Sequence, residues 1–218
     1  MNIGVLGTKD VGNAIATKLV LLGHNVKMGS RSATNEKAAE WVKNNGALAS
    51  QGTFADAAKF AGEFIFNCTS GAGSLDALKS AGAENLNGKI LIDISNPLDF
   101  SKGFPPSLTV SNTDSLGEQI QRAFPELKVV KALNTLSNPL MVNPMLVNNG
   151  DHTLPVCGND EGAKAKVVSL LNTFGWKKEN ILDLGDLTAS RGMEAWLLLW
   201  VRIFGKLQTP MFQMKVVK

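Results

Sequence analysis

The sequence is poor in the side chains that metal centres and disulfide-stabilised folds require. Its 218 residues include two cysteines, two histidines and no tyrosine. Cys68 and Cys157 each end an apolar run, and neither stands at a metal-binding spacing, so we expect inert free thiols. His24 and His152 lie before strand-like runs and are expected to be turn or surface residues. The composition therefore predicts no metal site and no nucleophilic or histidine catalytic group.

A strong charge of one sign and long apolar runs are also missing. The net charge is +3, and the basic residues are scattered, which gives no indication of a nucleic-acid or membrane partner. The most apolar stretch, residues 195–204, is short and contains Arg202, so it does not predict a transmembrane span. Met1 leads directly into a strand pattern without a signal stretch. These features favour a cytoplasmic protein.

Short apolar runs alternate with helical patterns along the whole chain. Strands are expected at residues 1–6, 25–29, 47–49, 63–68, 89–94, 128–133, 153–157 and 181–184. Helices are expected at residues 11–22, 37–44, 53–60, 75–81, 115–124, 161–174 and 187–207, with a Gly/Pro-rich loop at 100–106. This alternation predicts an α/β fold, a Rossmann-type doubly wound and mainly parallel sheet. We divide the chain into a nucleotide-binding core, residues 1–150, and a short α/β extension, residues 151–218, ending in a long apolar helix.

A glycine turn joins the first expected strand to the first helix. It reads Gly7-Thr8-Lys9-Asp10-Val11-Gly12, with glycine at the outer positions of G-x-G-x-x-G and lysine at the middle one. Between a strand and a helix, such a turn holds the pyrophosphate of a dinucleotide. A side chain at the middle position pushes the ligand outward or contacts it, and an ammonium group can do the latter. The alternative is that Lys9 points to solvent from a loop that binds nothing.

The residues after the second expected strand indicate which dinucleotide binds. An NAD enzyme places Asp or Glu there to accept hydrogen bonds from the ribose hydroxyls. This chain has Ser30 and Arg31 instead. A hydroxyl and a guanidinium group suit a 2′-phosphate. The sequence therefore predicts NADP(H) rather than NAD(H).

Mostly polar residues stand at the carboxyl ends of three further expected strands. In a doubly wound sheet, ligands lie beyond the carboxyl ends of the strands, so these residues are candidates for the cofactor site. They are Asn67, Cys68, Thr69, Asn96, Pro97, Asn134 and Thr135. The asparagine side chains could bond the nicotinamide carboxamide or a ring edge, or they could cap helices. Gly71 and Gly73 are expected to leave room for a flat ring.

Four stretches of the chain resemble the deazaflavin (coenzyme F420)-dependent NADP oxidoreductase family. They are residues 7–12, 29–31, 154–160, and 183–185 followed by 189–194. The chain is also similar to the cytosolic oxidoreductase domain of six-transmembrane epithelial metalloreductases. The resemblance implies a Rossmann core, NADPH, and hydride transfer to or from a flavin-like ring.

The resemblance also implies roles for particular residues. It assigns pyrophosphate contacts to Thr8, Asp10 and Val11, the 2′-phosphate to Ser30 and Arg31, the further lysine of the next helix to Lys37, and the nicotinamide end to Asn134 and Thr135. The deazaflavin enzymes tend to have His where Asn134 stands and a bulkier apolar residue near Thr69 to Gly71. This chain is more polar and less bulky at both places.

These observations predict an NADPH-dependent oxidoreductase with a flavin or deazaflavin as co-substrate. Hydride transfer between two stacked rings needs position and exclusion of water, and no nucleophile or metal. One alternative is an NADPH-binding sensor or interaction module without turnover, and another is a reductase of a different small substrate. The last helix is apolar nearly all round, which favours either a homodimer contact or burial in the core.

Overall fold

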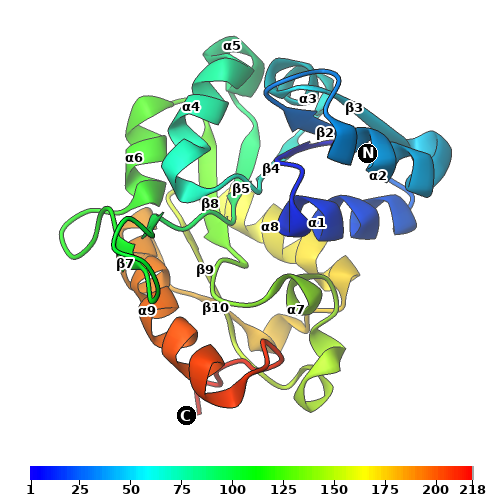
Figure 1. Cartoon of the computed structure of the whole chain (residues 1–218). Helices are drawn as coiled ribbons and strands as arrows, with labels where there is room; N and C mark the ends of the chain where they lie inside the picture. The colour runs from blue at the N-terminus through cyan, green and yellow to red at the C-terminus, as the bar shows by residue number, and fades with distance from the viewer. Residues whose placement is uncertain (218) are drawn as a thin grey trace.

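The computed structural model describes residues 1–217, and most of its strands form one eight-stranded sheet (Figure 1). The order of the strands is β10-β9-β8-β5-β4-β1-β2-β3, and neighbours are parallel except for the antiparallel pair β8 and β9. The strands are β1 (Asn2–Leu6), β2 (Asn25–Ser30), β3 (Ala49–Thr53), β4 (Phe64–Asn67), β5 (Ile90–Asp93), β8 (Lys128–Ala132), β9 (Leu154–Gly158) and β10 (Ile181–Asp183). The predicted doubly wound, mainly parallel α/β fold is confirmed.

Helices cover both faces of the sheet and enclose two separate cores. The first core lies under α1 (Asp10–Leu21), α2 (Glu36–Asn45), α7 (Asn138–Val142) and α8 (Glu161–Phe174). The second lies under α3 (Phe54–Phe60), α4 (Gly71–Ala81), α5 (Ala83–Leu86), α6 (Leu116–Ala123) and α9 (Ser190–Leu207). Alternate residues of one strand serve the two cores, since Phe64 and Phe66 face the first and Ile65 the second. The apolar strand runs are continuous for this reason.

Several helices begin where the sequence provides a capping side chain. The Asn35 side chain accepts a hydrogen bond from the Ala38 amide at the start of α2, and Asp160 accepts one from Ala163 at the start of α8. Thr53 and Asp56 form a reciprocal capping box at the start of α3. These caps satisfy amides that the helix itself leaves free. They place the strand-to-helix turns, and with them the ligand-facing loops, at defined positions.

Some local expectations were wrong. The weak third strand begins at Ala49 rather than at residue 47, because the short 3₁₀ turn Gly46–Leu48 precedes it. The helices α5 and α7 were not predicted, since they are too short for a periodic pattern. The expected Gly/Pro-rich loop is flanked by a two-stranded ribbon, β6 (Leu98–Asp99) and β7 (Ser107–Leu108).

His152 was expected at the surface or in a turn, but its side chain is buried. Only 2% of the residue is exposed. The ring lies edge-on to Trp176, and its Nε2 is 2.9 Å from the Pro144 carbonyl oxygen. The apolar run that follows it draws this residue into the first core. His152 therefore serves packing.

The carboxyl-terminal part of the chain continues the main sheet. β9 and β10 extend it at one edge, and the Thr153 amide donates a hydrogen bond to the Met214 carbonyl. The long final helix is confirmed as a 3₁₀ turn, Leu187–Ala189, followed by α9. Among residues 1–217, no helix is long and apolar enough to cross a membrane. A division of the chain at residue 150 stays a prediction.

Candidate functional site

The glycine turn forms a narrow cradle between β1 and α1. Gly7 has a φ of +115°, and a Cβ on it would lie 2.6 Å from the Cys68 carbonyl oxygen. A Cβ on Gly12 would lie 2.1 Å from the carbonyl oxygen of Gly7. Both outer positions therefore require glycine. Lys9, at the middle position, has an extended backbone with φ of −87°, which any side chain tolerates, and its side chain is exposed.

A cavity of about 540 Å³ opens between this turn, the end of β2 and the helix α4. We call it the β2–α4 pocket. It brings together seven of the predicted residues, namely Gly7, Thr8, Lys9, Ser30, Arg31, Cys68 and Thr69. Ser70 and Gly73, which belong to the segment expected to receive the ring, also line it. Its remaining lining residues were missed: Ser32, Asn35, Phe54, Asp76, Ala77 and Ser80. Ser32 and Asn35 come soon after Arg31 in the chain, so their position in the sequence could have indicated them. The α4 residues reach the pocket only because of how that helix packs in the fold.

Ser30 and Arg31 have different surroundings in this pocket. The Arg31 side chain is exposed and makes no hydrogen bond or ion pair with another residue of the described chain, so it can meet an anion. The Ser30 hydroxyl donates to the Ser32 carbonyl at 2.6 Å and lies 3.3 Å from the Ser32 amide. Ser30 therefore shapes the turn that presents Arg31.

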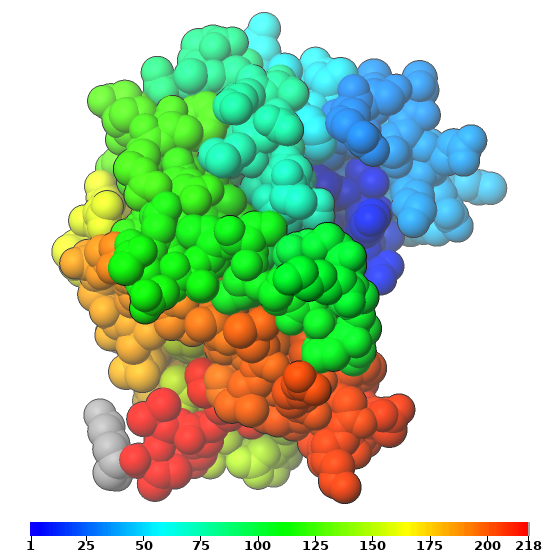
Figure 2. Space-filling view, turned by 60° about the vertical axis from the view of Figure 1, so that its left-hand side comes forward, coloured from blue at the N-terminus to red at the C-terminus, as the bar shows by residue number. Residues whose placement is uncertain are grey.

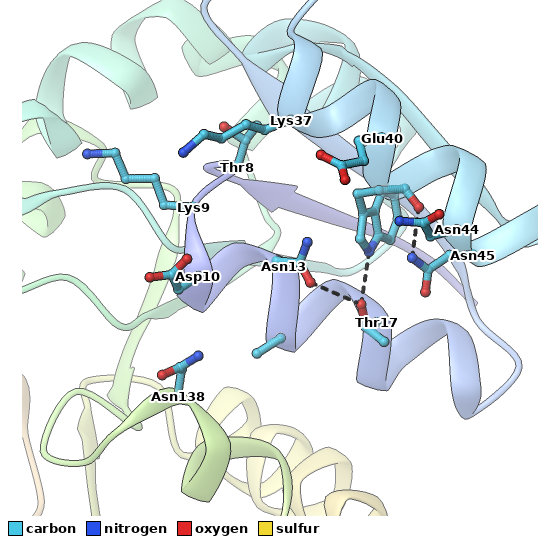
Figure 3. Close-up of a pocket in the computed structure, with 12 residues that line it drawn as sticks. Thr8, Lys9, Asp10, Asn13, Thr17, Lys37, Glu40, Asn44, Asn45 and Asn138 are labelled. Carbon is cyan, nitrogen blue, oxygen red and sulfur yellow. Dashed lines mark hydrogen bonds between the residues drawn. The ribbon is translucent and has the colours of Figure 1, made fainter. Parts of the chain in front are cut away.

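A groove of about 630 Å³ runs along the other side of the turn, between α1 and α2 (Figure 3). Lys37, Asp10 and Asn138 line it, and it shares Thr8 and Lys9 with the β2–α4 pocket. In Figure 3 the side chains of Lys9 and Lys37 extend in the same direction near Thr8. Lys37 thus stands on the groove side of the turn. Val11, the remaining predicted residue of the turn, packs against the core.

Asn67, predicted to contact a ligand, is engaged inside the protein. It has no exposed surface. Its Nδ2 donates to Asp93 Oδ1 at 2.8 Å and to the Ser74 hydroxyl at 3.1 Å, and its Oδ1 accepts from the Thr69 hydroxyl at 2.6 Å. Asn67 therefore holds Thr69 in place, and Thr69 is the member of the pair that reaches the pocket.

Asn96 and Asn134 link the loops after β5 and β8. Asn96 Nδ2 donates to the Asn134 carbonyl, and Asn134 Nδ2 donates to Asn96 Oδ1, each at 2.9 Å. Three buried atoms of the second loop, Asn134 Oδ1, Thr135 Oγ1 and Ser137 Oγ, have no hydrogen-bond partner within residues 1–217. Buried polar atoms in folded proteins are nearly always bonded, so each of these three atoms calls for a partner, such as a bound molecule or water. Ser137 was not predicted, although it continues the polar run after the strand.

The expected space beside Gly71 is filled. A Cβ on Gly71 would lie 2.0 Å from the Asn96 carbonyl oxygen and 2.8 Å from Pro97 Cα. The start of α4 therefore packs directly on the loop after β5, and the prediction that Gly71 leaves room for a ring was wrong. Around Gly73, which lines the β2–α4 pocket, the nearest atom to such a Cβ is the Ser70 hydroxyl oxygen at 3.5 Å.

Sequence comparisons identify the family to which this chain belongs. Residues 2–97 match the family described as NADP oxidoreductase, coenzyme F420-dependent. The F420-dependent NADP reductase of Methanocaldococcus jannaschii is 32% identical over 204 residues, which cover 89% of this chain and 88% of that protein. The chain belongs to the F420-dependent NADP oxidoreductase family. The resemblance inferred from the four sequence stretches is thereby confirmed, and NADP-dependent oxidoreduction is the activity class of this family.

Two other relatives extend the comparison. A solved structure from Arthrobacter sp. FB24, described as a candidate F420-dependent NADP reductase, is 48% identical with a TM-score of 0.94, and the match covers 100% of both chains. The metalloreductase STEAP3 of Rattus norvegicus is 32% identical over 196 residues, 88% of this chain. The chain spans about a third of the length of that relative, 36%. A reductive aminase of Aspergillus terreus, solved with NADPH, is 16% identical with a TM-score of 0.66 and is similar in fold alone.

A buried ion cluster below the strand ends was missed by the sequence analysis. Lys131 Nζ lies 2.7 Å from Asp93 Oδ2 and 2.7 Å from Glu194 Oε1, and it donates to the Ser95 carbonyl at 2.6 Å. At most 1% of each of the three side chains is exposed. Burial opposes the charged form of the ammonium, but the two carboxylates hold the pKa of Lys131 above its ordinary value. We call these three residues the Lys131 cluster.

Both cysteines are free thiols, as expected. Burial raises the pKa of the Cys68 thiol above its ordinary value, and nearby Asp93 adds to the shift. Burial likewise raises the pKa of Cys157 to about 11. The thiolate is the reactive form of cysteine, so both side chains are unreactive near neutral pH.

Proposed function

We propose that this protein transfers hydride between NADP(H) and a flavin or deazaflavin ring. Family membership supports an NADP-dependent oxidoreductase. The finer statement about the second ring is carried by one observation, the three unpartnered buried atoms of Asn134, Thr135 and Ser137 in the loop after β8. They lie at the sheet edge where a doubly wound fold binds its ligands.

The residues of the cradle fit the adenosine and pyrophosphate half of NADP(H). The turn at Gly7 and Gly12 lets backbone approach a pyrophosphate at the start of α1, and helix amides favour an anion there. Arg31, free of internal partners, suits the 2′-phosphate, with Ser32 beside it in the same pocket. Lys9 supplies a cation next to the turn in place of the missing glycine. The β2–α4 pocket has the size and the polar lining for this half of the cofactor.

The strand-end loops fit the nicotinamide and its partner ring. NADP(H), when bound, supplies or receives the hydride at its nicotinamide ring. Asn134 Oδ1 is a free acceptor that suits a carboxamide N–H, while the hydroxyls of Thr135 and Ser137 can donate to ring carbonyls or accept from ring N–H groups. Their burial excludes water from the reacting atoms. For a hydride transfer, the protein has to position the two rings against each other and exclude water from them.

A second copy of the chain is a further part of this proposal. Much of α9 lies at the surface (Figure 2), and Leu198, Leu199 and Leu207 on it are exposed. An isologous contact between two such helices would bury these side chains. Analytical ultracentrifugation of the wild-type protein and of a Leu199→Glu variant measures this directly. We expect a dimer that the variant converts to monomers, and a monomeric wild type would contradict the contact.

Stopped-flow mixing tests the hydride acceptor. Protein loaded with NADPH is mixed with riboflavin, FMN or coenzyme F420, or with a small carbonyl compound as the control. We expect the nicotinamide absorbance to fall only with a flavin-type ring, as one hydride from NADPH and one proton from water reduce it. A protein that binds NADPH without loss of absorbance with any ring would be a sensor or interaction module. Loss with the carbonyl compound alone would indicate a reductase of another small substrate.

A further inference from the structure

The stretch Ala189–Glu194 helped to reveal the family, yet neither pocket includes any of its residues. Glu194 lies in the second turn of α9 and is 1% exposed. A carboxylate is rarely buried so completely without a specific set of partners. Its partners therefore indicate what this motif does.

Glu194 joins three parts of the protein. Its Oε2 accepts from the Leu116 amide at 2.9 Å, and its Oε1 accepts from the Gly117 amide at 3.0 Å, so it caps the start of α6. The same Oε1 lies 2.7 Å from Lys131 Nζ. One side chain of α9 thus fixes both α6 and the interior strand β8.

Stability alone does not account for this cluster. Two carboxylates share one ammonium group in the interior. The α6 amides donate to Glu194, and the Asn67 side chain and the amide and hydroxyl of Ser95 donate to Asp93. Buried charge clusters can often be replaced by apolar side chains without loss of stability. What such a cluster adds is a defined geometry, because each charge must keep its partners.

The Lys131 cluster connects to all three loops that line the proposed ring site. Asp93 Oδ1 accepts from Asn67, which holds Thr69 in the loop after β4. In the loop after β5, the Ser95 carbonyl accepts a hydrogen bond from Lys131, and the Ser95 amide and hydroxyl donate to Asp93.

The third connection runs through α9. The Met193 carbonyl, next to Glu194, accepts from Asn134 Nδ2 at 3.1 Å. Trp196 lies about one helical turn after Met193 and faces the same loop, where its Nε1 donates to the Thr135 carbonyl at 3.0 Å. The start of α9 therefore holds the loop after β8 on two sides.

We infer that Glu194 is a positioning residue, which through Lys131 and the start of α9 sets the spacing of the three strand-end loops and hence of the two reacting rings. The inference rests on the proposed function for the reaction itself. Glu194 touches neither ring in this scheme. It acts on Asn134 and Thr135, which do.

The chain offers a matched control on the same pair of helices. Glu118 of α6 accepts from Arg191 of α9, with Oε2 2.9 Å from Nε and Oε1 2.6 Å from a terminal nitrogen. This pair also joins α6 to α9 but, within residues 1–217, makes no hydrogen bond or ion pair with Lys131 or with the three loops. Loss of Glu118 therefore loosens the helix pair without disturbing the loops.

The experiment compares Glu194→Gln, Trp196→Phe and Glu118→Gln with the wild-type protein. The first measurement is NADPH affinity together with the fluorescence of the bound nicotinamide, which depends on how rigidly that ring is held. We expect Glu194→Gln to keep its NADPH Kd within about twofold while losing at least half of the fluorescence enhancement, because the adenosine half holds most of the affinity. Trp196→Phe should change in the same direction, and Glu118→Gln should match the wild type.

The second measurement is turnover with NADPH deuterated at the transferred position. Misplaced rings slow the chemical step, so kcat should fall about tenfold in Glu194→Gln with a larger isotope effect. A loss of folded protein would lower kcat without changing the isotope effect. Equal losses in Glu194→Gln and Glu118→Gln that follow their melting temperatures, or no change in Glu194→Gln, would overturn the inference.

Two outcomes keep this test separate from that of the proposed function. If the wild-type protein reduces no ring, the proposed function fails, and the fluorescence measurement alone decides whether Glu194 positions the nicotinamide. If Glu194→Gln does not fold, Trp196→Phe decides, because it leaves the Lys131 cluster intact and removes only the bond to Thr135. An unchanged fluorescence in folded Trp196→Phe would then overturn the inference.

Discussion

Replacement of Arg31 by alanine should remove the preference for NADP(H) over NAD(H) that we propose for the β2–α4 pocket. The Arg31 guanidinium is exposed and has no partner among residues 1–217, so its loss leaves no buried group unsatisfied and the fold should be unchanged. Ser30 remains bound to Ser32 and keeps the shape of the turn. The effect should therefore appear in binding and not in stability.

The magnitude follows from the chemistry of the contact. A hydrogen bond to a charged group contributes about 1.5–3 kcal/mol. Because solvent weakens hydrogen bonds in an open pocket, we expect one or two such bonds from Arg31 to contribute together about 1.5–3 kcal/mol to the binding free energy of NADP(H). Since about 1.4 kcal/mol corresponds to a tenfold change in affinity, the Kd for NADP(H) should rise roughly tenfold to a hundredfold. The Kd for NAD(H), which lacks the 2′-phosphate, should stay within about twofold.

Isothermal titration of both cofactors into both proteins measures this difference. Arg202→Ala is the control, because Arg202 is an exposed arginine on α9 that lines neither pocket. Arg31→Lys should fall between the wild type and Arg31→Ala, since it keeps the charge but loses the paired donors of the guanidinium. An Arg31→Ala protein that still prefers NADP(H), or a wild type that binds both cofactors equally, would refute the assignment.

Three further predictions concern other sites. In fluorescence titrations, Lys9→Ala should weaken the binding of NADP(H) and of NAD(H) alike, and Lys9→Gly should recover much of the lost affinity. Unchanged binding by the alanine variant would show that Lys9 is a solvent-exposed loop residue that does not contact the cofactor. Gly71→Ala should markedly lower the melting temperature, because its Cβ would lie 2.0 Å from the Asn96 carbonyl oxygen; a wild-type melting curve would count against this packing. Hydrogen bonding from Arg122 lowers the pKa of Asp114 from 3.8 to about 2, so the bridge stabilises the fold above about pH 4 and is lost as the pH falls through 2. Asp114→Asn should therefore unfold at lower urea near pH 7, with a free energy of unfolding lower by about 0.2–1 kcal/mol for so exposed a pair. The difference from the wild type should disappear as the pH falls below 2; a difference independent of pH would contradict it.

The order of strands and helices could be predicted because it depends on neighbours in the chain. A strand buried on both faces reads as an apolar run, such as residues 64–67, and capping residues such as Asn35 and Asp160 act within three residues of themselves. The glycine turn after β1 could be predicted for the same reason, because it too depends on neighbouring residues in the chain. Its shape depends on Gly7 and Gly12, and Arg31 directly follows β2, so the roles that we propose for them rest on the local pattern alone.

The loops beyond β4, β5 and β8 were predicted as a group, but not which of their atoms face a ligand. Asn67 and Asn134 are chemically alike and both follow a strand. Asp93, 26 residues away from Asn67, engages its amide group, whereas the Oδ1 of Asn134 is left without a partner in the described chain. Gly71 likewise meets Asn96 because of how α4 packs on the sheet.

Only the tertiary structure shows which residues form the Lys131 cluster and where α9 packs on the sheet. Asp93 lies 38 residues from Lys131, and Glu194 lies 78 residues from the Leu116 amide that it caps. In the sequence these three charges stand in separate segments, and no spacing pairs them with one another. Their burial depends on three segments meeting at one point of the sheet, where each carboxylate finds the ammonium or the amides that offset the loss of water. No local pattern carries that information, because the free energy of a buried charge is set by partners that the fold brings from elsewhere in the chain.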